Sequence, residues 1–310
     1  MEVSILMNLS IIIVNWNTRE MLSECLKSIY ARPPSGEFEV WVVDNASADG
    51  SSAMVRERYP QVKLIENPSN SGFAYANNLA LRQASGRYLL LLNSDTFVKP
   101  NALEALRQFM EDHPEAGACG SRLLNPDGSL QVSCYVHPTL KNEFLRMFHL
   151  DGIFPQSRYR MNEWATDQAR EVEVIQGACL LLRRESLEQV GLLDEQFFMY
   201  SEDYDLCYRL RKGNWKLYWV PWSEVVHFGG QSTKQVAAEM FLHLYRSKMI
   251  CMRKHYGRLA AILYKLILIF SAVFRLIVTP LTWLERAQVR QQHQVLAENY
   301  CRLLMALPTM

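Results

Sequence analysis

Tyr88-Leu-Leu-Leu-Leu-Asn93-Ser94-Asp95 decides the fold, because an apolar run passes directly into polar residues of which the last is a carboxylate. An uninterrupted apolar run of this length is typical of a strand buried on both faces of a sheet. Open α/β sheets bind their ligands at the carboxyl ends of such strands. The segment therefore predicts a central strand that delivers Asp95 to a ligand-binding edge.

Two other apolar runs end in the same manner. Phe38-Glu-Val-Trp-Val-Val43 is followed by Asp44 and Asn45, and Leu9-Ser-Ile-Ile-Ile-Val14 is followed by Asn15-Trp16-Asn17. Helical segments separate the strands as far as residue 121, and strands that alternate with helices favour right-handed βαβ units. We therefore expect an α/β fold with a mostly parallel central sheet flanked by helices, and polar groups from three strands at one edge.

Beyond residue 121 this alternation stops. Asn125-Pro-Asp-Gly128 predicts a turn between short β-like runs, and residues 139–170 read as an irregular aromatic loop. Further elements are expected as strands at Val172–Gln176, Ala178–Arg183 and Trp215–Val220, a helix at Asp203–Lys212, and helices at 233–256 and 258–306 with a break near Pro280. The pattern divides the chain into residues 1–235, with halves at about 1–121 and 122–235, and a helical region at 236–310.

The composition excludes several classes of function. The 310 residues include 33 basic and 32 acidic side chains, so no overall field favours nucleic acid. The seven cysteines are scattered without a Cys-x-x-Cys pair, which favours a reducing compartment over a disulfide framework or a zinc site. No dinucleotide-binding or P-loop glycine motif follows a strand. The N-terminus has no basic region followed by a long apolar stretch, so no signal peptide is expected.

The polar strand ends suit a phosphate-containing ligand. Asp95, two residues after Asn93, can hold Mg²⁺ or Mn²⁺ with few protein ligands, since these ions also accept substrate phosphate oxygens. Asp44 can accept hydrogen bonds from a nucleobase or a ribose hydroxyl. The alternative for both carboxylates is the capping of a turn. Trp16 either offers a ring edge to the base or belongs to the core.

Two motifs in the second half carry ionisable groups. Phe197-Phe-Met-Tyr-Ser-Glu202-Asp203-Tyr-Asp205 places three carboxylates in four positions behind an aromatic run. Adjacent carboxylates beside a low-dielectric wall repel, which raises the pKa of one toward the range of a general base, although a helix start also favours acidic residues. His227, followed by two glycines, reads as a metal ligand, a phosphate contact or a structural histidine.

These motifs, in this order, resemble the inverting family 2 glycosyltransferases with the GT-A fold, especially the rhamnosyltransferase-like members, over about residues 9–235. The resemblance is carried by Ile11–Asn17, Val42–Ser47, Asn67–Asn78, Leu92–Asp95, Gln176–Ala178, Tyr200–Asp203 and His227. It implies a GT-A type, Rossmann-like sheet with a nucleotide-sugar half and an acceptor half. It also implies direct displacement of a sugar, rhamnose or another deoxyhexose, from a dTDP- or UDP-linked donor to a hydroxyl of a lipid-linked or polysaccharide acceptor.

The resemblance also assigns residue roles. Asp203 becomes the catalytic base, Asp44 the nucleobase contact, and Asp95 and His227 the ligands of a divalent cation, Mg²⁺ or Mn²⁺. The expected nucleotide-sugar-binding residues are Asn15, Trp16, Asn17, Asp44, Asn45, Asn78, Asn93, Ser94 and Asp95, and those on the acceptor side are Gln176, Gly177 and Glu202. The metal motif of the family often begins with a second aspartate, and Asn93 stands there in this chain.

The helical region contains the longest apolar tract. Residues 259–278 are long enough, at about 1.5 Å per residue, to cross the hydrocarbon of a bilayer, but Lys265 and Arg275 interrupt them. Because Lys254, Arg258 and Lys265 fall on one side of a helical wheel, residues 258–280 are predicted to lie in the membrane interface. A core helix is an alternative, and a transmembrane span is disfavoured by the interior cations. We expect a cytoplasmic enzyme associated with the inner face of the cell membrane.

Two other functions share parts of the pattern. A nucleotidyltransferase has strand-end carboxylates on a similar sheet, but it usually needs a phosphate loop rich in glycine and basic residues after the first strand, and Asn15–Thr18 is not such a loop. A membrane-bound nucleotide-sugar-binding module without catalysis has no reason to keep Asp44, Asp95, Asp203 and His227 together. The glycosyltransferase remains the leading hypothesis.

Overall fold

The computed structural model describes residues 7–154, 157–279 and 287–310. The chain separates into two compact units. The first contains the chain up to His137, Tyr159–Phe198 and Glu202–Gln235; the second contains Pro138–Arg158, Met199–Ser201 and the chain from Val236 onward. Pro138–Arg158, which the sequence pattern places with the first part, thus clusters with the C-terminal helices.

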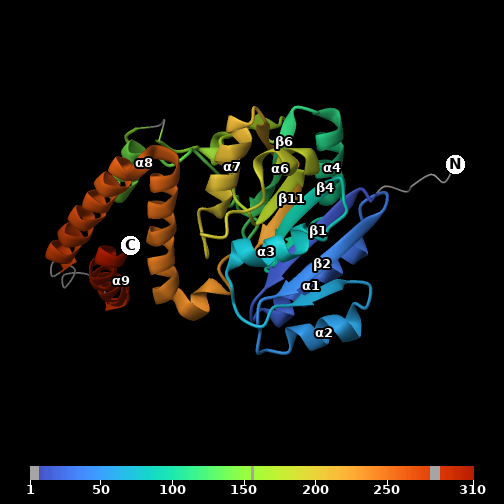
Figure 1. Cartoon of the computed structure of the whole chain (residues 1–310), viewed down its shortest axis with the longest axis horizontal. Coiled ribbons are helices and arrows are strands. Elements are labelled where there is room, and N and C mark those ends of the chain that lie inside the picture. Colours follow the sequence, from blue (N-terminus) through green and yellow to red (C-terminus); the bar gives the residue numbers. More distant parts are fainter. Residues whose placement is uncertain (1–6, 155–156, 280–286) are drawn as a thin grey trace. The chain divides into compact units, whose positions relative to one another are not determined.

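A mostly parallel sheet forms the centre of the first unit (Figure 1). Its strands are Leu9–Asn15 (β1), Phe38–Asp44 (β2), Lys63–Glu66 (β3), Tyr88–Asn93 (β4), Thr96–Val98 (β5), Ala116–Leu124 (β6), Arg170–Glu171 (β8), Cys179–Arg183 (β10) and Lys216–His227 (β11). Their order is β3-β2-β1-β4-β10-β6-β11-β5, with β8 beside β11. Strands β3, β2, β1 and β4 run parallel, as do β6 and β11, whereas β10 lies antiparallel between β4 and β6. A second, two-stranded sheet pairs Cys134–Tyr135 (β7) with Val174–Ile175 (β9).

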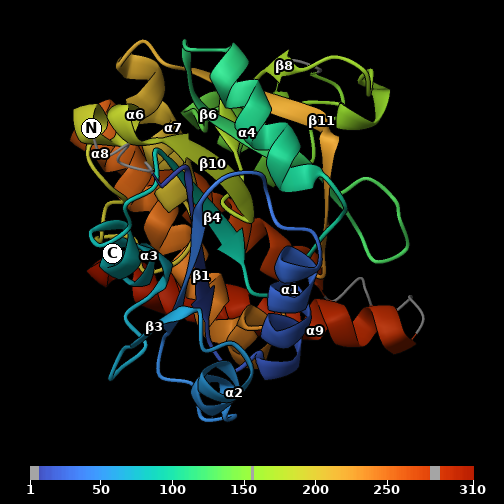
Figure 2. The same ribbon diagram turned by 90° about the vertical axis from the view of Figure 1, so that its right-hand side faces the viewer.

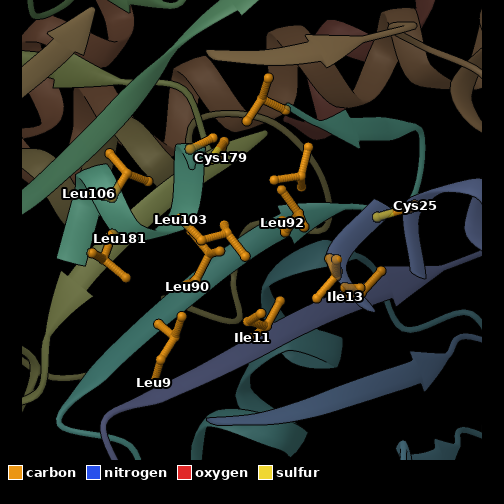
Figure 3. Close-up of a cluster of buried hydrophobic side chains, with 14 of the residues drawn as sticks. Leu9, Ile11, Ile13, Cys25, Leu90, Leu92, Leu103, Leu106, Cys179 and Leu181 are labelled. Carbon is orange, nitrogen blue, oxygen red and sulfur yellow. The ribbon is translucent and has the colours of Figure 1, made fainter. Parts of the chain in front are cut away.

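Helices cover both faces of the sheet (Figure 2). Arg19–Ala31 (α1), Ser51–Arg58 (α2) and Ala102–Asp112 (α4) pack on one face, and Phe73–Leu81 (α3), Arg184–Val190 (α6) and Glu202–Lys212 (α7) pack on the other. Successive strand residues point to opposite faces, so an apolar run supplies both cores. In β1, Ile11 and Ile13 belong to the first core and Ile12 to the second. Figure 3 shows Ile11 and Ile13 beside Leu90 and Leu92 of β4.

The strands and helices expected before residue 121 are confirmed, and the differences lie mainly beyond it. The reversed direction of β10 and the short strand β5 are not predicted by the sequence pattern. The expected irregular loop at 139–170 is wrong in part, because Leu140–Met147 forms helix α5 and Met161–Glu163 a 3₁₀ turn. Helix α5 begins where the hydroxyl of Thr139 accepts a hydrogen bond from the backbone N–H of Asn142 (3.1 Å).

The second unit is helical. Ala237–Val278 (α8) follows a short 3₁₀ turn at Thr233–Val236 and bends at Gly257, whose φ of 88° is non-helical (Figure 1). Ala287–Ala306 (α9) ends in a 3₁₀ turn at Leu307–Thr309. The break between residues 256 and 258 is confirmed, whereas the break expected near Pro280 lies outside the described residues.

The second half of α8 carries an apolar stripe. The helical span Thr233–Val278 is long and apolar enough, by length and composition, to cross a membrane, and 22% of its most apolar 18-residue window is buried. The exposed apolar side chains of the second half recur at helical spacing and are Leu259, Ile262, Leu263, Leu266, Ile269, Phe270, Val273, Phe274 and Ile277. The opposite side, with Tyr264 and Leu268, packs into the core of this unit.

Candidate active site

The ends of β1 and β2 hold Asp44 by both carboxylate oxygens. Asn15 and Asp44 are register partners, and the Asn15 amide donates to Asp44 Oδ1 (3.1 Å). The backbone N–H of Ser47 donates to Asp44 Oδ2 (3.1 Å). In the turns that follow β1 and β2, Asn17 and Ala46 adopt φ values of 51° and 65°, in the left-handed region that non-glycine residues seldom occupy. These two strained turns keep Asp44 at the carboxyl edge of the sheet as a fixed hydrogen-bond acceptor.

An asparagine-rich loop surrounds Asn45. Its side-chain oxygen accepts from the Asn67 amide (2.8 Å), and its amide donates to Asn70 Oδ1 (2.7 Å). At the end of this loop Gly72 has φ 84°, and a Cβ there would lie 2.2 Å from the carbonyl oxygen of Phe198. The loop between Asn67 and Gly72 therefore packs directly on the backbone that leads to Glu202 and Asp203.

Ser94 and Asp95 follow β4 at the same edge. Ser94 Oγ lies 2.9 Å from Thr18 Oγ1, which links the ends of β4 and β1. Asp95 is buried; its Oδ2 accepts from the backbone N–H of Gln231 (3.3 Å), and its Oδ1 lies 3.3 Å from His227 Nε2. Burial raises the pKa of Asp95, but the hydrogen bond and charge of His227 and the Gln231 N–H outweigh it, so the net pKa lies below the ordinary value.

Asp95 and His227 fit a divalent cation. The amide of Asn93 lies 3.2 Å from His227 Nε2, so a carboxylate oxygen, an imidazole nitrogen and an amide face one another. Within the described residues, no cluster of three or more His, Cys, Asp or Glu side chains is placed to hold a metal. A cation here would therefore complete its coordination with water and phosphate oxygens, which Mg²⁺ readily accepts.

Asp203 lies in the first turn of α7. Its Oδ2 accepts from the Gly177 N–H (3.2 Å) and its Oδ1 from the Tyr204 N–H (2.8 Å). Burial raises the pKa of Asp203 to about 6, although both N–H groups oppose the rise. For the buried neighbour Glu202, burial and the charge of Asp203 raise the pKa well above its ordinary value. Near neutral pH Asp203 is thus ionised and able to accept a proton, whereas Glu202 keeps its proton to a higher pH than an ordinary glutamate does.

Strand β10 connects the two carboxylate sites. Because it runs antiparallel to β4, the residues that precede it lie at the carboxyl edge of β4. The Asn93 N–H donates to the Ala178 carbonyl (3.0 Å), and the adjacent Gly177 holds Asp203. Gln176 is fixed here by its backbone, whose N–H donates to the Ser133 carbonyl (2.8 Å). The structure thus places Asp44, Asp95, His227 and Asp203 along one edge of the sheet.

The side chain of Asn78, a predicted nucleotide-sugar contact, is bonded within the protein. Its amide nitrogen donates to the Leu193 carbonyl (2.8 Å) and to Glu195 (2.9 Å), and its oxygen accepts from the Leu193 N–H (3.2 Å). Because these bonds engage both ends of the buried amide, Asn78 anchors the segment before α7, and its contact with a nucleotide sugar stays a prediction.

The segment after His227 runs back to Trp16 and Asn17, which directly follow β1. The sequence pattern does not predict this contact. Ser232 Oγ donates to the Trp16 carbonyl (3.0 Å), and the Gln235 amide donates to the Asn17 carbonyl (3.0 Å). The Trp16 ring is half-buried. The paired glycines at 229 and 230, with φ 69° and 67°, were the available signal for this reversal.

Known proteins share this sequence pattern and fold. Residues 10–191 match the family model described as glycosyl transferase family 2. The N-acetylglucosaminyl-diphospho-decaprenol L-rhamnosyltransferase of Mycobacterium tuberculosis (strain CDC 1551 / Oshkosh) is 31% identical over 238 residues, which cover 70% of this chain and 76% of the relative.

Solved structures show the same GT-A type of fold. A mannosyltransferase from Pyrobaculum calidifontis in complex with GDP-Man and Mn²⁺ has a TM-score of 0.56 at 19% identity, over 96% of this chain and 85% of the other. GalNAc-T7 with UDP, GalNAc and Mn²⁺ has a TM-score of 0.55 at 17% identity, over 72% of this chain and 44% of the other. At these identities the likeness concerns the fold alone. Together with the family match, it establishes that the chain is a glycosyltransferase and belongs to glycosyl transferase family 2.

Proposed function

We propose that this glycosyltransferase moves rhamnose or another deoxyhexose from a dTDP- or UDP-linked donor to a hydroxyl of a lipid-linked or polysaccharide acceptor. The observation that carries the proposal is the placement of Asp203, a carboxylate with a pKa of about 6, on the same strand edge as the Asp95–His227 pair. The rhamnosyltransferase relative supports the choice of sugar and of a lipid-linked acceptor.

The donor is bound by the ends of β1, β2 and β4. Asp44 accepts hydrogen bonds from the nucleobase. Asn15 orients Asp44 through its side-chain amide, and the Asn45 N–H bonds to the Asn15 carbonyl, which ties the ends of β1 and β2 together. Asp95 and His227 would hold a divalent cation, Mg²⁺ or Mn²⁺, and its charge would offset the negative charge on the departing diphosphate. The solved structures of similar fold that contain Mn²⁺ support such a cation.

Asp203 acts as the catalytic base. It takes the proton from the acceptor hydroxyl while that oxygen attacks the anomeric carbon from the face opposite the diphosphate, so the configuration inverts. Burial and the charge of Asp203 raise the pKa of the neighbouring Glu202, which disfavours a second negative charge beside the base. Glu202, Gln176 and Gly177 form the acceptor side of Asp203.

The test is release of nucleoside diphosphate from a panel of donors, with and without Mn²⁺, followed by NMR of the anomeric product. We expect a dTDP- or UDP-deoxyhexose to give the fastest release, in a Mn²⁺-dependent manner and with inversion, and Asp203→Asn to abolish transfer while donor binding stays nearly intact. Release from hexose donors alone would refute the proposed sugar. A product with retained configuration would refute direct displacement.

We also propose that the enzyme acts at the inner face of the cell membrane. The exposed apolar stripe of α8 lies next in the chain to the exposed cations Arg253, Lys254 and Arg258, an arrangement that favours an interfacial helix on anionic lipid. Arg275 donates to the Met147 carbonyl (2.9 Å) and is therefore occupied within its own unit.

Sedimentation with anionic vesicles tests this location. The full chain should sediment with them, and Phe270→Ser combined with Ile277→Ser should weaken the association, since each removes an exposed apolar side chain. The matched control is Val132→Ser, an exposed apolar residue of the other unit. Failure of the unaltered chain to sediment would refute the proposed membrane contact.

A further inference from the structure

Gln131 joins a surface turn to the proposed cation site. The turn at Asn125–Gly128 is closed by a bond from the Gly128 N–H to the Asn125 carbonyl (2.9 Å) and reverses the chain after β6. The Gln131 N–H then pairs with the Leu123 carbonyl (2.9 Å), which places its side chain beside the end of β11. There Gln131 Oε1 lies 2.6 Å from His227 Nδ1.

The surroundings fix which end of the Gln131 amide faces the histidine. Its Nε2 lies 3.1 Å from the backbone carbonyl oxygen of His227 and 2.9 Å from Asn125 Oδ1. A backbone carbonyl can only accept, so the nitrogen must face it and the oxygen must face Nδ1. Since an amide oxygen also only accepts, His227 Nδ1 must carry the proton in this bond.

This bond determines where the lone pair of the imidazole lies. A neutral ring has a single N–H, so a proton on Nδ1 leaves Nε2 as an acceptor. Nε2 is the atom 3.3 Å from Asp95 Oδ1 and 3.2 Å from the Asn93 amide. In the neutral ring, two acceptor atoms of different residues thus face each other. This contact is unfavourable; a bound cation would relieve it, and so would protonation of the ring, which lets Nε2 donate to Asp95.

We propose that Gln131 is a positioning residue that holds His227 in the Nδ1–H form, so that the Nε2 lone pair is available to the divalent cation; this rests on the proposed function. Without the Gln131 oxygen, the ring is free to carry its proton on Nε2, where it would bond to Asp95. That bond would occupy both cation ligands at once. Metal-binding histidines commonly donate their second N–H to a carbonyl or carboxylate, and loss of that partner typically weakens metal binding by about 10- to 100-fold.

The experiment compares Gln131→Met, which keeps the length and removes the oxygen, with Gln131→Glu, which keeps an oxygen acceptor. Ser129→Ala is the matched control, because it disturbs the same turn through Asn125 and leaves Gln131 untouched. Two quantities are measured at one mildly alkaline pH. The first is the tautomer of His227 in metal-free protein, from ¹⁵N spectra of histidine-labelled samples, with His227→Asn identifying the resonance. The second is the Kd of Mn²⁺ in the presence of UDP or dTDP, from EPR of free Mn²⁺.

We expect Nδ1–H in the unaltered protein, in Gln131→Glu and in Ser129→Ala, and a shift toward Nε2–H in Gln131→Met with a Kd about 10- to 100-fold higher. An unchanged tautomer in Gln131→Met would overturn the inference. So would equal weakening of Mn²⁺ binding in Gln131→Met and Ser129→Ala, since that would reflect damage to the turn. If the unaltered protein binds no Mn²⁺, the cation of the proposed function fails, and the tautomer still decides the role of Gln131 by itself.

Discussion

Replacement of Asp203 by asparagine should change how the stability of the protein depends on pH. Folding raises the pKa of this carboxyl from its ordinary 3.8 to about 6, so the folded state holds the proton more tightly than the unfolded state does. The folded state is therefore favoured below about pH 4 and loses this advantage as the pH rises to about 6. The shift corresponds to about 3 kcal/mol, an upper value because the side chain keeps some contact with water.

The Asp203→Asn variant has no such titration, so it should gain stability relative to the unaltered protein as the pH rises. A constant offset accompanies this gain, because the asparagine amide cannot accept from both the Gly177 and Tyr204 N–H groups; its cost is about 1 kcal/mol. The informative quantity is the change in the difference between the two proteins, which should grow by up to about 3 kcal/mol between pH 4 and pH 7.

Urea unfolding followed by circular dichroism over this pH range measures that difference. The exposed Asp167→Asn is the matched control and should give a nearly constant difference, because an exposed carboxylate changes its surroundings little on folding. A constant difference for Asp203→Asn as well would refute the buried, proton-holding state of Asp203. The proposed base would then lose its physical basis, even if the variant were inactive.

Three further predictions follow from the geometry. Transfer by the unaltered enzyme should rise with pH through about 6 as Asp203 ionises, and an initial-rate profile that stays flat from about pH 5 to pH 8 would contradict this. Gly72→Ala should cost about 2–4 kcal/mol in urea unfolding, because its Cβ would meet the Phe198 carbonyl, whereas Gly128→Ala, with the same φ of 84° and open space, should cost about 1 kcal/mol. Glu143→Ala should destabilise the second unit by about 3 kcal/mol, since it leaves Lys248 (2.7 Å away) without its buried partner; hydrogen exchange of α5 measures this, with the exposed Glu20→Ala as control.

The sequence predicts the central strands because a strand buried on both faces is apolar throughout, and polar residues follow it where it reaches the edge of the sheet. It cannot predict the direction of β10, since an apolar run of five residues reads the same in either orientation. Helix α5 is missed for another reason. It has only eight residues, and its buried Glu143 pairs with Lys248, 105 positions away, so much of what stabilises it is absent from its own segment.

The same distinction separates the residues whose position follows from local sequence from those whose contacts do not. Asp44, Asp95 and Asp203 stand at the ends or starts of strongly patterned elements, so local pattern is sufficient to predict where they lie on the sheet, while their roles stay predictions. The roles of Asn78 and Gln131 depend on partners 115 and 96 positions away. A polar side chain in a loop or on a helix carries no local sign of which distant carbonyl or ring it will meet.

The antiparallel insertion of β10 is the physical reason that the residues proposed for donor and acceptor chemistry share one edge. Had β10 run parallel to β4, Gly177 would lie at the amino edge, away from Asp95. Instead its N–H holds Asp203, and the next residue accepts from the backbone of Asn93. The proposed base is thus attached to the neighbour of the strand that bears the proposed cation ligand, through the backbones of two paired strands. Because paired strands resist sliding, the separation between Asp203 and Asp95 is set by the sheet. In the proposed function, loops of variable sequence could then alter the acceptor without disturbing that separation.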